Sequence, residues 1–428
     1  MKISMFTNTY APHVGGVAKS VETYETEFRE RGHDVRIIAP HMEGEDPNQK
    51  HILRVPSISD FNGSGFALRV PQPFLISDYI DEFAPDVIHT HHPFLLGDAA
   101  LRTAYERRLP LVFTHHTMYE QYTHYLPFDF ESFKRVAVQI ATEYCNLCHH
   151  VIAPSRSVEQ LLRRRGVTVP ITTIPTGIDL QFLDSGNRRI FREAHGIPHD
   201  AIVVGHVGRL SEEKNLRFLA EAAGIYLKEH PSAVFLIVGD GESSDGMKAI
   251  LEEYVAPEHY IFVGRQVGHE LVDAYAAMDL FVFSSQSETQ GMVLAEALAA
   301  GNPVVALDGP GVREIVDEQN GRLLESDATA GEFADAIDGL TIETKRLWRI
   351  ADQARLSVET YSLKSCADRL ESFYQTLIDE HPHQALEPLS AWERMEGRLE
   401  AEWKLLVEKS SALAAAVVET EATTASLV

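Results

Sequence analysis

The sequence predicts an α/β protein with two doubly wound, Rossmann-like domains that face one another across a cleft, followed by a helical extension. Three observations predict this fold. A chain of 428 residues is too long for one ordinary hydrophobic core. Short apolar runs alternate with helical patterns in both halves, which is typical of βα units around a parallel sheet. The Pro-Thr-Gly segment within residues 174–179 separates the two series, and we interpret it as the hinge.

The elements follow from apolar runs of strand length and from apolar residues at helical spacing. In the first half we expect strands at residues 3–6, 35–39, 87–89, 111–114 and 151–153, and helices at 17–31, 99–106 and 133–150. In the second half we expect strands at residues 203–206, 234–238, 261–263, 280–283 and 304–306, and helices at 215–228 and 248–254.

The predicted boundaries give four segments. Residues 1–175 form an N-terminal domain, 176–355 a C-terminal domain, 356–380 a further helix, and 381–428 an extension with a polar, disordered end. Apolar residues recur at helical spacing in the extension and predict an amphipathic helix over 389–417. We expect this stripe to dock on a domain or on a twin subunit rather than on lipid. Its members are Leu389, Trp392, Met395, Leu399, Trp403 and Leu406.

The charge is strongly negative but uneven along the chain. The net charge is −25, and residues 1–170 hold 17 Lys and Arg against 20 Asp and Glu. The overall acidity argues against nucleic acid as a partner. A basic face on the N-terminal domain, where the membrane would touch, remains open. Its candidate residues are Arg102, Arg107, Arg108, Lys134, Arg135 and Arg163, Arg164 and Arg165.

Cysteine use and the first residues predict the compartment. Three cysteines do not make a disulfide framework, and the start of the chain has no charged segment followed by an apolar block. No run approaches the 18 or so apolar residues that span a bilayer. We expect a cytoplasmic enzyme whose membrane contact, if it has one, is peripheral, on the inner face.

Two glutamates flank the start of a predicted helix. Glu288 lies in a polar turn after a strand, and Glu296 lies eight residues later within the helix. This separation is about 12 Å along a helix, which matches the length of a nucleotide sugar. The amides of Gln290, Gly291 and Met292 open the helix, where a diphosphate is favoured. A strand, turn and helix with exposed glutamates is the plainer interpretation of the same spacing.

Other polar groups also follow predicted strands. Arg209 and Lys214 would stabilise negative charge on a leaving diphosphate, unless they are merely a solvated basic pair. Gly15 and Gly16 precede a helix and let the backbone approach a phosphate, although they do not form G-x-G-x-x-G. His115 and His116 are adjacent and cannot face the same way, so one enters the cleft and the other packs.

A metal site is the alternative use of the histidines and cysteines. Cys145 and Cys148 precede two further histidines and look like half a zinc site, and three histidines cluster within residues 89–92. The cysteine pair falls in a helical pattern and no second C-x-x-C follows. We therefore predict no metal site.

The motifs together resemble the retaining glycosyltransferases of family 4. The resemblance covers about residues 1–380 and rests on four strings in order: Gly-Gly-Val, His-His-Thr, Gly-Arg to Glu-Lys, and E-x7-E. It implies the two-Rossmann GT-B fold, with the helix after residue 356 crossing back over the first domain. It also implies that Gly15 and Gly16 face the donor phosphates, that Arg209 and Lys214 neutralise them, that Glu296 holds the ribose, and that Glu288 and His116 position the hexose. His115 is then structural, and no metal or other cofactor is required.

The string from Thr114 to Tyr125 is closest to bacterial 1,2-diacylglycerol 3-glucosyltransferases. That resemblance implies UDP-glucose as donor, with GDP-mannose second, and a lipid acceptor bordered by Tyr119, Tyr122 and Tyr125. A plain aromatic loop is the alternative for these tyrosines. A soluble sugar or sugar-phosphate acceptor also remains open. From other classes, a nucleotide-sugar epimerase, a phosphorylase and a non-catalytic nucleotide-binding protein that assembles through the C-terminal helix remain alternatives.

Overall fold

The computed structural model describes residues 1–13, 15–46, 48–58, 68–69, 73–118, 131–381, 397–402, 404, 405 and 407. They belong to two units with separate cores. Unit 1 comprises Met1–Thr176 together with Ala367 onward, and unit 2 comprises Gly177–Cys366. The two parallel sheets that the sequence predicts are both present, one in each unit.

Unit 1 is built on a seven-stranded parallel sheet in the order β3-β2-β1-β6-β7-β8-β9. Strands β4 and β5 form a separate antiparallel pair. The strands are β1 (Lys2–Phe6), β2 (Asp34–Pro40), β3 (Ile52–Val55), β4 (Ser57–Ile58), β5 (Leu68–Arg69), β6 (Val87–Thr90), β7 (Leu111–Thr114), β8 (His150–Ala153) and β9 (Ile171–Thr173). The helices are α1 (Gly16–Glu30), α2 (Pro73–Phe83), α3 (Leu96–Arg107), α4 (Glu131–Leu147), α5 (Arg156–Arg164) and α14 (Leu363–Glu380).

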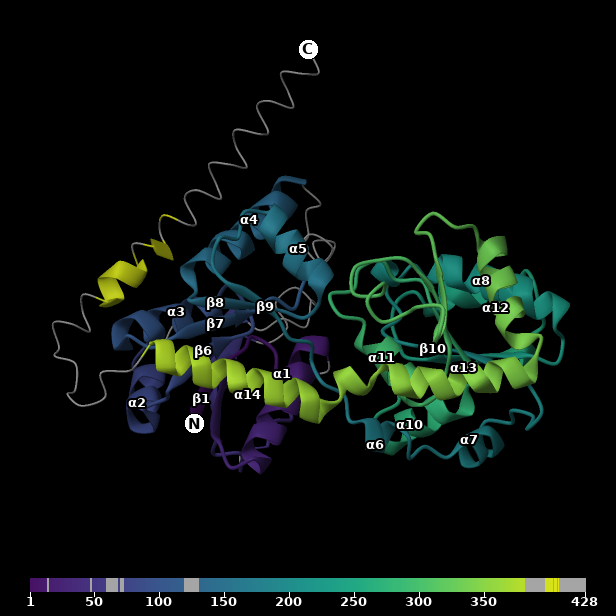
Figure 1. Cartoon of the computed structure of the whole chain (residues 1–428), viewed down its shortest axis with the longest axis horizontal. Coiled ribbons are helices and arrows are strands. Elements are labelled where there is room, and N and C mark those ends of the chain that lie inside the picture. The colour runs from purple at the N-terminus through teal and green to yellow at the C-terminus, as the bar shows by residue number, and fades with distance from the viewer. Residues whose placement is uncertain are drawn as a thin grey trace, which may run out of the picture. The chain divides into compact units, whose positions relative to one another are not determined.

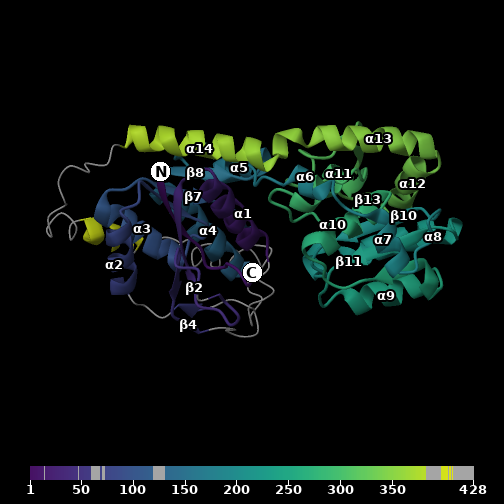
Figure 2. The ribbon, with the colours of Figure 1, turned by 90° about the horizontal axis from the view of Figure 1, so that it is seen from below.

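Helices cover both faces of this sheet. One face packs against α2, α3, α4 and α5 in a single core that includes Ile80, Leu101 and Tyr144. Helices α1 and α14 lie side by side elsewhere on the unit, as Figures 1 and 2 both show. The Phe28 and Tyr374 ring centroids are 5.8 Å apart, and Arg31 pairs with Glu371 at 2.9 Å. These contacts join α14 to α1, the first helix of the chain.

Unit 2 contains a six-stranded parallel sheet in the order β12-β11-β10-β13-β14-β15. The strands are β10 (Val203–Val207), β11 (Val234–Val238), β12 (Tyr260–Phe262), β13 (Leu280–Phe283), β14 (Val304–Leu307) and β15 (Gly321–Leu324). The helices are α6 (Leu180–Leu183), α7 (Arg188–Ala194), α8 (Leu216–Glu229), α9 (Ser244–Glu252), α10 (Gly268–Ala277), α11 (Met292–Ala299), α12 (Ala330–Thr341) and α13 (Thr344–Ser357), with short 3-10 turns at Glu212–Lys214, Pro257–His259 and Glu359–Tyr361.

Two apolar layers sandwich the sheet of unit 2. One core contains side chains of α8, α9 and α12, among them Leu219, Met247 and Phe333. The other contains side chains of α7, α10 and α11, among them Phe191 and Leu294. Figure 1 shows α8 and α12 on one side of β10, with α10 and α7 on the other. The sheet is thus buried on both faces, and polar residues gather at the strand ends.

In the described part of the extension, the buried residues differ from the predicted stripe at Leu399. The described residues 397–402 are helical, and Leu399, the stripe residue that the structure describes, is 63% exposed. Ala401 and Leu405 are buried instead, and Gly397 lies so close to the carbonyl of Tyr105 that a Cβ atom would be 2.3 Å from its oxygen. Small residues four apart allow this close approach to α3. The other stripe residues, Leu389, Trp392, Met395, Trp403 and Leu406, lie outside the described residues or side chains.

Parts of the predicted basic face are internally paired. Arg102 Nε lies 2.6 Å from Glu402 Oε1, and Arg107 is only 6% exposed, with its Nε 2.9 Å from Asp81 Oδ1. Acidic side chains therefore offset the charge of these two candidate residues, and the partners come from helices that the sequence does not place nearby. No helix in the described part of the chain is long and apolar enough to span a bilayer.

Candidate active site

The candidate residues of both units follow strands at the point where the strand order reverses. In unit 2 the order reverses between β10 and β13, and in unit 1 between β1 and β6. Ligands of open α/β sheets bind outside the carboxyl ends of the strands at this switch point. Arg209 and Lys214 follow β10, and Glu288 follows β13. The topology therefore brings together side chains that are 74 positions apart in the sequence.

Lys214 and Glu288 form an ion pair in unit 2. Lys214 Nζ donates to Glu288 Oε1 at 2.5 Å, and both side chains are largely buried, at 16% and 17% exposure. Ser284 Oγ donates to the carbonyl of Lys214 at 2.9 Å, which fixes the loop after β10 against the end of β13. The sequence identified both charged residues but not that they pair.

Arg209 pairs with a glutamate that sequence reasoning missed. Its guanidinium lies 2.5 Å from Glu213 Oε1, which also accepts from Ser211 Oγ at 2.6 Å. Arg209 is 47% exposed, whereas the Glu213 side chain is 6% exposed. The hydrogen bond from Ser211 and the charge of Arg209 outweigh burial and lower the pKa of Glu213, although burial is the largest single cause and acts in the opposite direction. Glu213 is directly beside Lys214 in the sequence, and that adjacency was the available signal.

Two glycines hold the Arg209 loop against the loop after β11. A Cβ atom at Gly239 would be 1.8 Å from the carbonyl oxygen of Gly208, and one at Gly241 would be 2.2 Å from that of Leu210. Both glycines have φ near +150°. Only glycine allows this approach. The Gly-Asp-Gly string that follows the apolar run of β11 was the missed sequence signal.

Helix α11 starts at Met292, directly after a residue in the left-handed region. Gly291 has φ +75°, and no side chain among the described residues caps the helix. The preceding Gln290 is 5% exposed and is packed against Gly311, where a Cβ atom would be 2.9 Å from the Gln290 backbone. The first amides of a helix lack partners within it and favour an anion. This start places them one turn before Glu296.

Glu296 accepts a hydrogen bond from Tyr275 on α10. The phenol oxygen lies 2.8 Å from Glu296 Oε2, and the carboxylate side chain is half-buried. Burial, together with the negative charge of Glu296, raises the pKa of Tyr275 well above its usual value. Tyr275 is therefore a neutral donor that fixes one carboxylate oxygen of Glu296.

His206 lies beneath this site and was not predicted. It is 1% exposed in the middle of β10, and its Nδ1 lies 3.1 Å from the carbonyl of Val282. Burial, with a smaller contribution from Lys214, lowers the pKa of His206 to about 4. A histidine within the otherwise apolar strand was the signal. Its neutral ring supports the loop of Gly208, where a Cβ atom would be 3.3 Å from Nε2.

Gly15 and Gly16 form the start of α1 in unit 1. Gly15 is the N-cap in extended conformation, and Gly16 is the first helical residue. No side chain among the described residues caps this helix, and a Cβ atom on Gly16 would meet nothing within 4 Å. An open helix start of this kind suits an anion.

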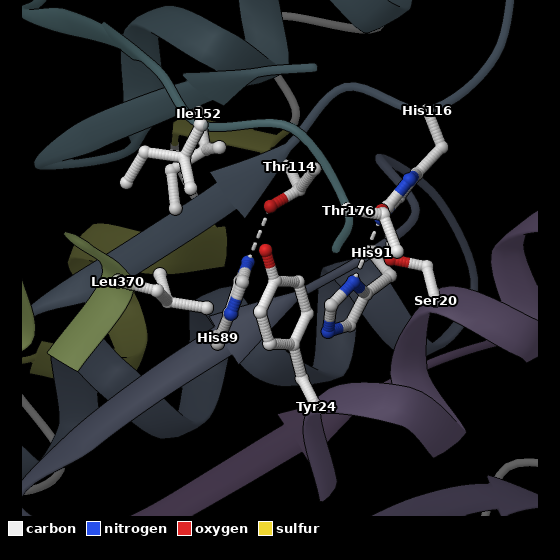
Figure 3. Close-up of a pocket in the computed structure, with 10 residues that line it drawn as sticks. Ser20, Tyr24, His89, His91, Thr114, His116, Ile152, Thr176 and Leu370 are labelled. Carbon is white, nitrogen blue, oxygen red and sulfur yellow. Dashed lines mark hydrogen bonds between the residues drawn. The ribbon is translucent and has the colours of Figure 1, made fainter. Parts of the chain in front are cut away.

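Histidines from two neighbouring strands of unit 1 gather around a small pocket. Figure 3 shows His89 of β6 with a dashed line to Thr114, and His91, directly after β6, with a dashed line to His116, just after β7. His91 Nδ1 lies 2.9 Å from His116 Nε2. His89 bonds Thr114 Oγ1 through Nε2 at 2.6 Å and the Tyr374 hydroxyl through Nδ1. His115 is 1% exposed and packs against Phe113.

The two cysteines of the predicted helical pattern lie in the core of unit 1. Helix α4 ends at Leu147 and strand β8 begins at His150, so the prediction of a helix to residue 150 was wrong at its end. Cys145 and Cys148 are buried among apolar side chains, and burial raises the pKa of the Cys145 thiol. Across the described residues, no three His, Cys, Asp or Glu side chains gather as metal ligands would. Tyr119, Tyr122 and Tyr125 lie outside the described residues.

The geometry favours an anionic ligand in unit 2 and a neutral polar ligand in unit 1. Unit 2 offers two cations and an open helix start, while unit 1 offers a second helix start and uncharged imidazoles. Burial lowers the pKa of both His91 and His116 well below the usual value, so both rings are neutral near pH 7.

Comparisons with known proteins match two family models to the chain, one after the other. Residues 14–182 match the family described as Glycosyltransferase Family 4, and residues 187–357 match Glycosyl transferases group 1. The chain is 31% identical to an alpha-monoglucosyldiacylglycerol synthase of Streptococcus pneumoniae over 74% of each protein. It is 30% identical to a GDP-mannose-dependent alpha-mannosyltransferase of Corynebacterium glutamicum, over 76% of this chain and 77% of that one. A solved sucrose-phosphate synthase from Thermosynechococcus elongatus superposes with a TM-score of 0.72 at 20% identity, over 89% of this chain and 99% of that one.

Proposed function

The chain belongs to glycosyltransferase family 4, and from this premise we propose that it is a retaining hexosyltransferase that uses a nucleoside-diphosphate sugar. Glucose from UDP-glucose is the favoured donor group, and the hydroxyl of a diacylglycerol-type lipid is the favoured acceptor. The observation that carries the donor part is the Lys214–Glu288 pair beside the start of α11, at the switch point of unit 2. This arrangement offers fixed positive charge and helix amides to a diphosphate.

In this proposal the residues of unit 2 bind and orient the donor. Arg209 and Lys214 neutralise the diphosphate, the amides near Gly291 bind its oxygens, and Glu296 accepts hydrogen bonds from the ribose. The hydrogen bond from Tyr275 to Glu296 Oε2, at 2.8 Å, orients the carboxylate for that contact. Lys214 moves from Glu288 toward the phosphates when the donor binds, and Glu288 then accepts hexose hydroxyls. Hydrogen bonds from two hexose hydroxyls to the Glu288 carboxylate then replace the charge-assisted hydrogen bond that it loses from Lys214.

The chemical step needs no protein nucleophile. The bond between the anomeric carbon and the diphosphate oxygen breaks, and the acceptor oxygen bonds to the same face of that carbon. The acceptor proton passes to the departing phosphate oxygen. Positioning and stabilisation of the leaving charge then supply the catalysis, with His116 orienting the hexose. Since Arg209 and Lys214 supply the positive charge, we expect EDTA to leave the rate unchanged, and full inhibition by EDTA would contradict this part.

The acceptor is argued from likeness and from the sequence between Thr114 and Tyr125. The pneumococcal relative is named as a synthase of alpha-monoglucosyldiacylglycerol, which supports a lipid acceptor. The corynebacterial relative is named for GDP-mannose, at almost the same identity, and supports GDP-mannose as the second candidate donor. A soluble acceptor remains the alternative to lipid for either donor. Membrane contact, on this proposal, is peripheral.

The deciding experiment measures nucleotide release from UDP-glucose and from GDP-mannose by purified protein. Each donor is tested with vesicles that contain diacylglycerol and with vesicles that lack it. We expect UDP release that depends on diacylglycerol, together with a hexosyl lipid in the organic extract. UDP release that does not depend on diacylglycerol would indicate a soluble acceptor. Nucleotide release from GDP-mannose alone would identify GDP-mannose, rather than UDP-glucose, as the donor. The Lys214→Ala variant is the control for contaminating hydrolase activity.

A further inference from the structure

His91 lies between two other histidines in the pocket of unit 1. It directly follows β6 and is 1% exposed. Its ring is nearly parallel to that of His116, with a centroid distance of 5.2 Å and an angle of 26°, and the centroid of the His89 ring lies 4.2 Å away. Figure 3 shows His91 between His116 and His89, with a dashed line to His116. Among the described residues, His116 is the one side chain that forms a hydrogen bond with the His91 ring.

The surroundings hold the His91 ring in place. Its backbone amide donates to the carbonyl of Phe6 at 2.9 Å, which fixes the start of the loop. His89 is itself fixed through both ring nitrogens, by Thr114 and Tyr374. A packed ring with a fixed neighbour on one side cannot reorient easily, so the direction of its Nδ1 toward His116 is set by unit 1 itself.

The hydrogen bonds assign the protons of both rings. His91 Nε2 is buried and has no hydrogen-bond partner among the described residues. An orphaned N–H is rarer in proteins than an acceptor lone pair without a donor, so Nε2 is the unprotonated nitrogen. His91 therefore carries its proton on Nδ1 and donates it to His116 Nε2. Because His116 Nε2 accepts, the neutral His116 ring carries its own proton on Nδ1.

We propose that His91 is a positioning residue that fixes the tautomer and the orientation of His116, so that His116 presents an Nδ1–H donor to the hexose. This inference rests on the proposed function for the identity of the ligand, a sugar hydroxyl. The tautomer itself does not depend on the reaction. Without His91, the His116 ring can rotate and can exchange to the Nε2–H tautomer, in which the nitrogen that faced the sugar no longer donates.

Three substitutions separate positioning from packing. In His91→Asn the side-chain amide occupies the place of Nδ1 and keeps a donor toward His116. In His91→Gln the amide reaches the place of Nε2 instead, and His91→Leu removes both polar positions. We expect His91→Leu and His91→Gln to lower kcat about 10- to 100-fold with little change in donor KM, because the reacting group is misplaced rather than unbound. His91→Asn restores kcat to within about threefold of the wild type.

The tautomer is measured directly by long-range ¹H–¹⁵N correlation spectra of protein labelled at histidine, with His116→Gln used to assign the signal. We expect the Nδ1–H pattern for His116 in the wild type and in His91→Asn, and a mixed or Nε2–H pattern in His91→Leu. An Nε2–H signal in the wild type would overturn the proposal, as would an Asn variant no more active than the Leu variant. If the wild type transfers no sugar, the proposed function fails, and the spectra still decide the tautomer.

Discussion

The side chains at the strand ends of unit 2 are charged and paired, whereas the histidines around the pocket of unit 1 are neutral and buried. In unit 2, Lys214 meets Glu288 and Arg209 meets Glu213, with Arg209 about half exposed. In unit 1, His89 and His91 are each 1% exposed and burial lowers the pKa of both. Burying a neutral imidazole costs far less than burying a charge. The difference teaches that unit 2 is built to exchange ionic partners, and unit 1 to hold a fixed hydrogen-bond pattern.

We expect the largest difference between the two units when the pH is lowered. Burial lowers the pKa of His89 and His92 to about 3 and that of His115 to about 4, while the unfolded chain has the ordinary value near 6.5. The unfolded state therefore binds more protons between these values. The stability that the neutral rings contribute is complete above about pH 7, falls as the pH drops through 6.5, and stops falling below the folded pKa. At pH 5 each such ring costs roughly 2 kcal/mol.

Unit 1 should therefore lose more stability in acid than unit 2. Among the described histidines of unit 2, His206 is the one that burial holds neutral, with a pKa lowered to about 4. The measurement is hydrogen exchange at pH 7 and pH 5, corrected for the intrinsic rates, with peptides assigned to each unit. We expect the larger loss of protection in β1, β6 and β7. Equal losses in β10 and β13 would mean that the buried histidines of unit 1 do not set its acid limit.

The next largest effect concerns the cations of unit 2. Lys214→Ala removes a fixed charge from the leaving diphosphate, and we expect kcat to fall about 10²- to 10³-fold. The substitution also leaves Glu288 without its partner, so the double variant Lys214→Ala with Glu288→Gln is needed. Recovery in the double variant would assign the loss to repulsion by Glu288. Lys228→Ala, at an exposed position on α8, is the matched control and should leave kcat unchanged.

Glu296 provides a smaller test of the same site. Glu296→Ala should weaken donor binding roughly 10- to 100-fold, because a hydrogen bond to a charged group contributes about 1.5–3 kcal/mol. Isothermal titration with the nucleoside diphosphate, without acceptor, measures the dissociation constant. Tyr275→Phe serves as a graded comparison, since it keeps the carboxylate but removes its orienting bond at 2.8 Å. Unchanged affinity in Glu296→Ala would remove this residue from the donor site.

The sequence predicted the fold class and the central strands of both sheets, but not the edge strands β3, β9 and β15. Apolar runs such as that of β13, bounded by polar turns, allowed the strands to be placed within a few residues, because burial on both faces leaves a strong local pattern. The same locality identified Glu288, Lys214 and His116, since polar residues directly after a buried strand lie at the edge where parallel sheets bind ligands. These are short-range signals.

The partners of those residues could not be predicted, because they depend on which strands are neighbours. Lys214 and Glu288 meet only because β13 pairs with β10, and His91 meets His116 only because β6 pairs with β7. The prediction that Leu399 of the C-terminal extension packs against the protein was wrong for a related reason. Periodicity favours the large side chains of a helix, whereas the packed face here uses Gly397 and Ala401, whose small size permits close approach.

The smallest predicted effect tests whether the backbone at the start of α11 matters as much as its charges. Gly291 has φ +75°, so Gly291→Ala should cost about 1–2 kcal/mol, and the new Cβ would also make a tight contact of 3.0 Å with Leu294 Cδ1. Gly339 is the matched control: it lies inside α12 with nothing within 4 Å, and alanine there should add about 0.5–1 kcal/mol. Thermal unfolding and donor titration are measured on both. If Gly291→Ala lowers the stability but leaves the donor affinity unchanged, the helix amides contribute little to donor binding, and Arg209 and Lys214 bind the diphosphate. If affinity falls more than stability, the orientation of those amides is part of the donor site.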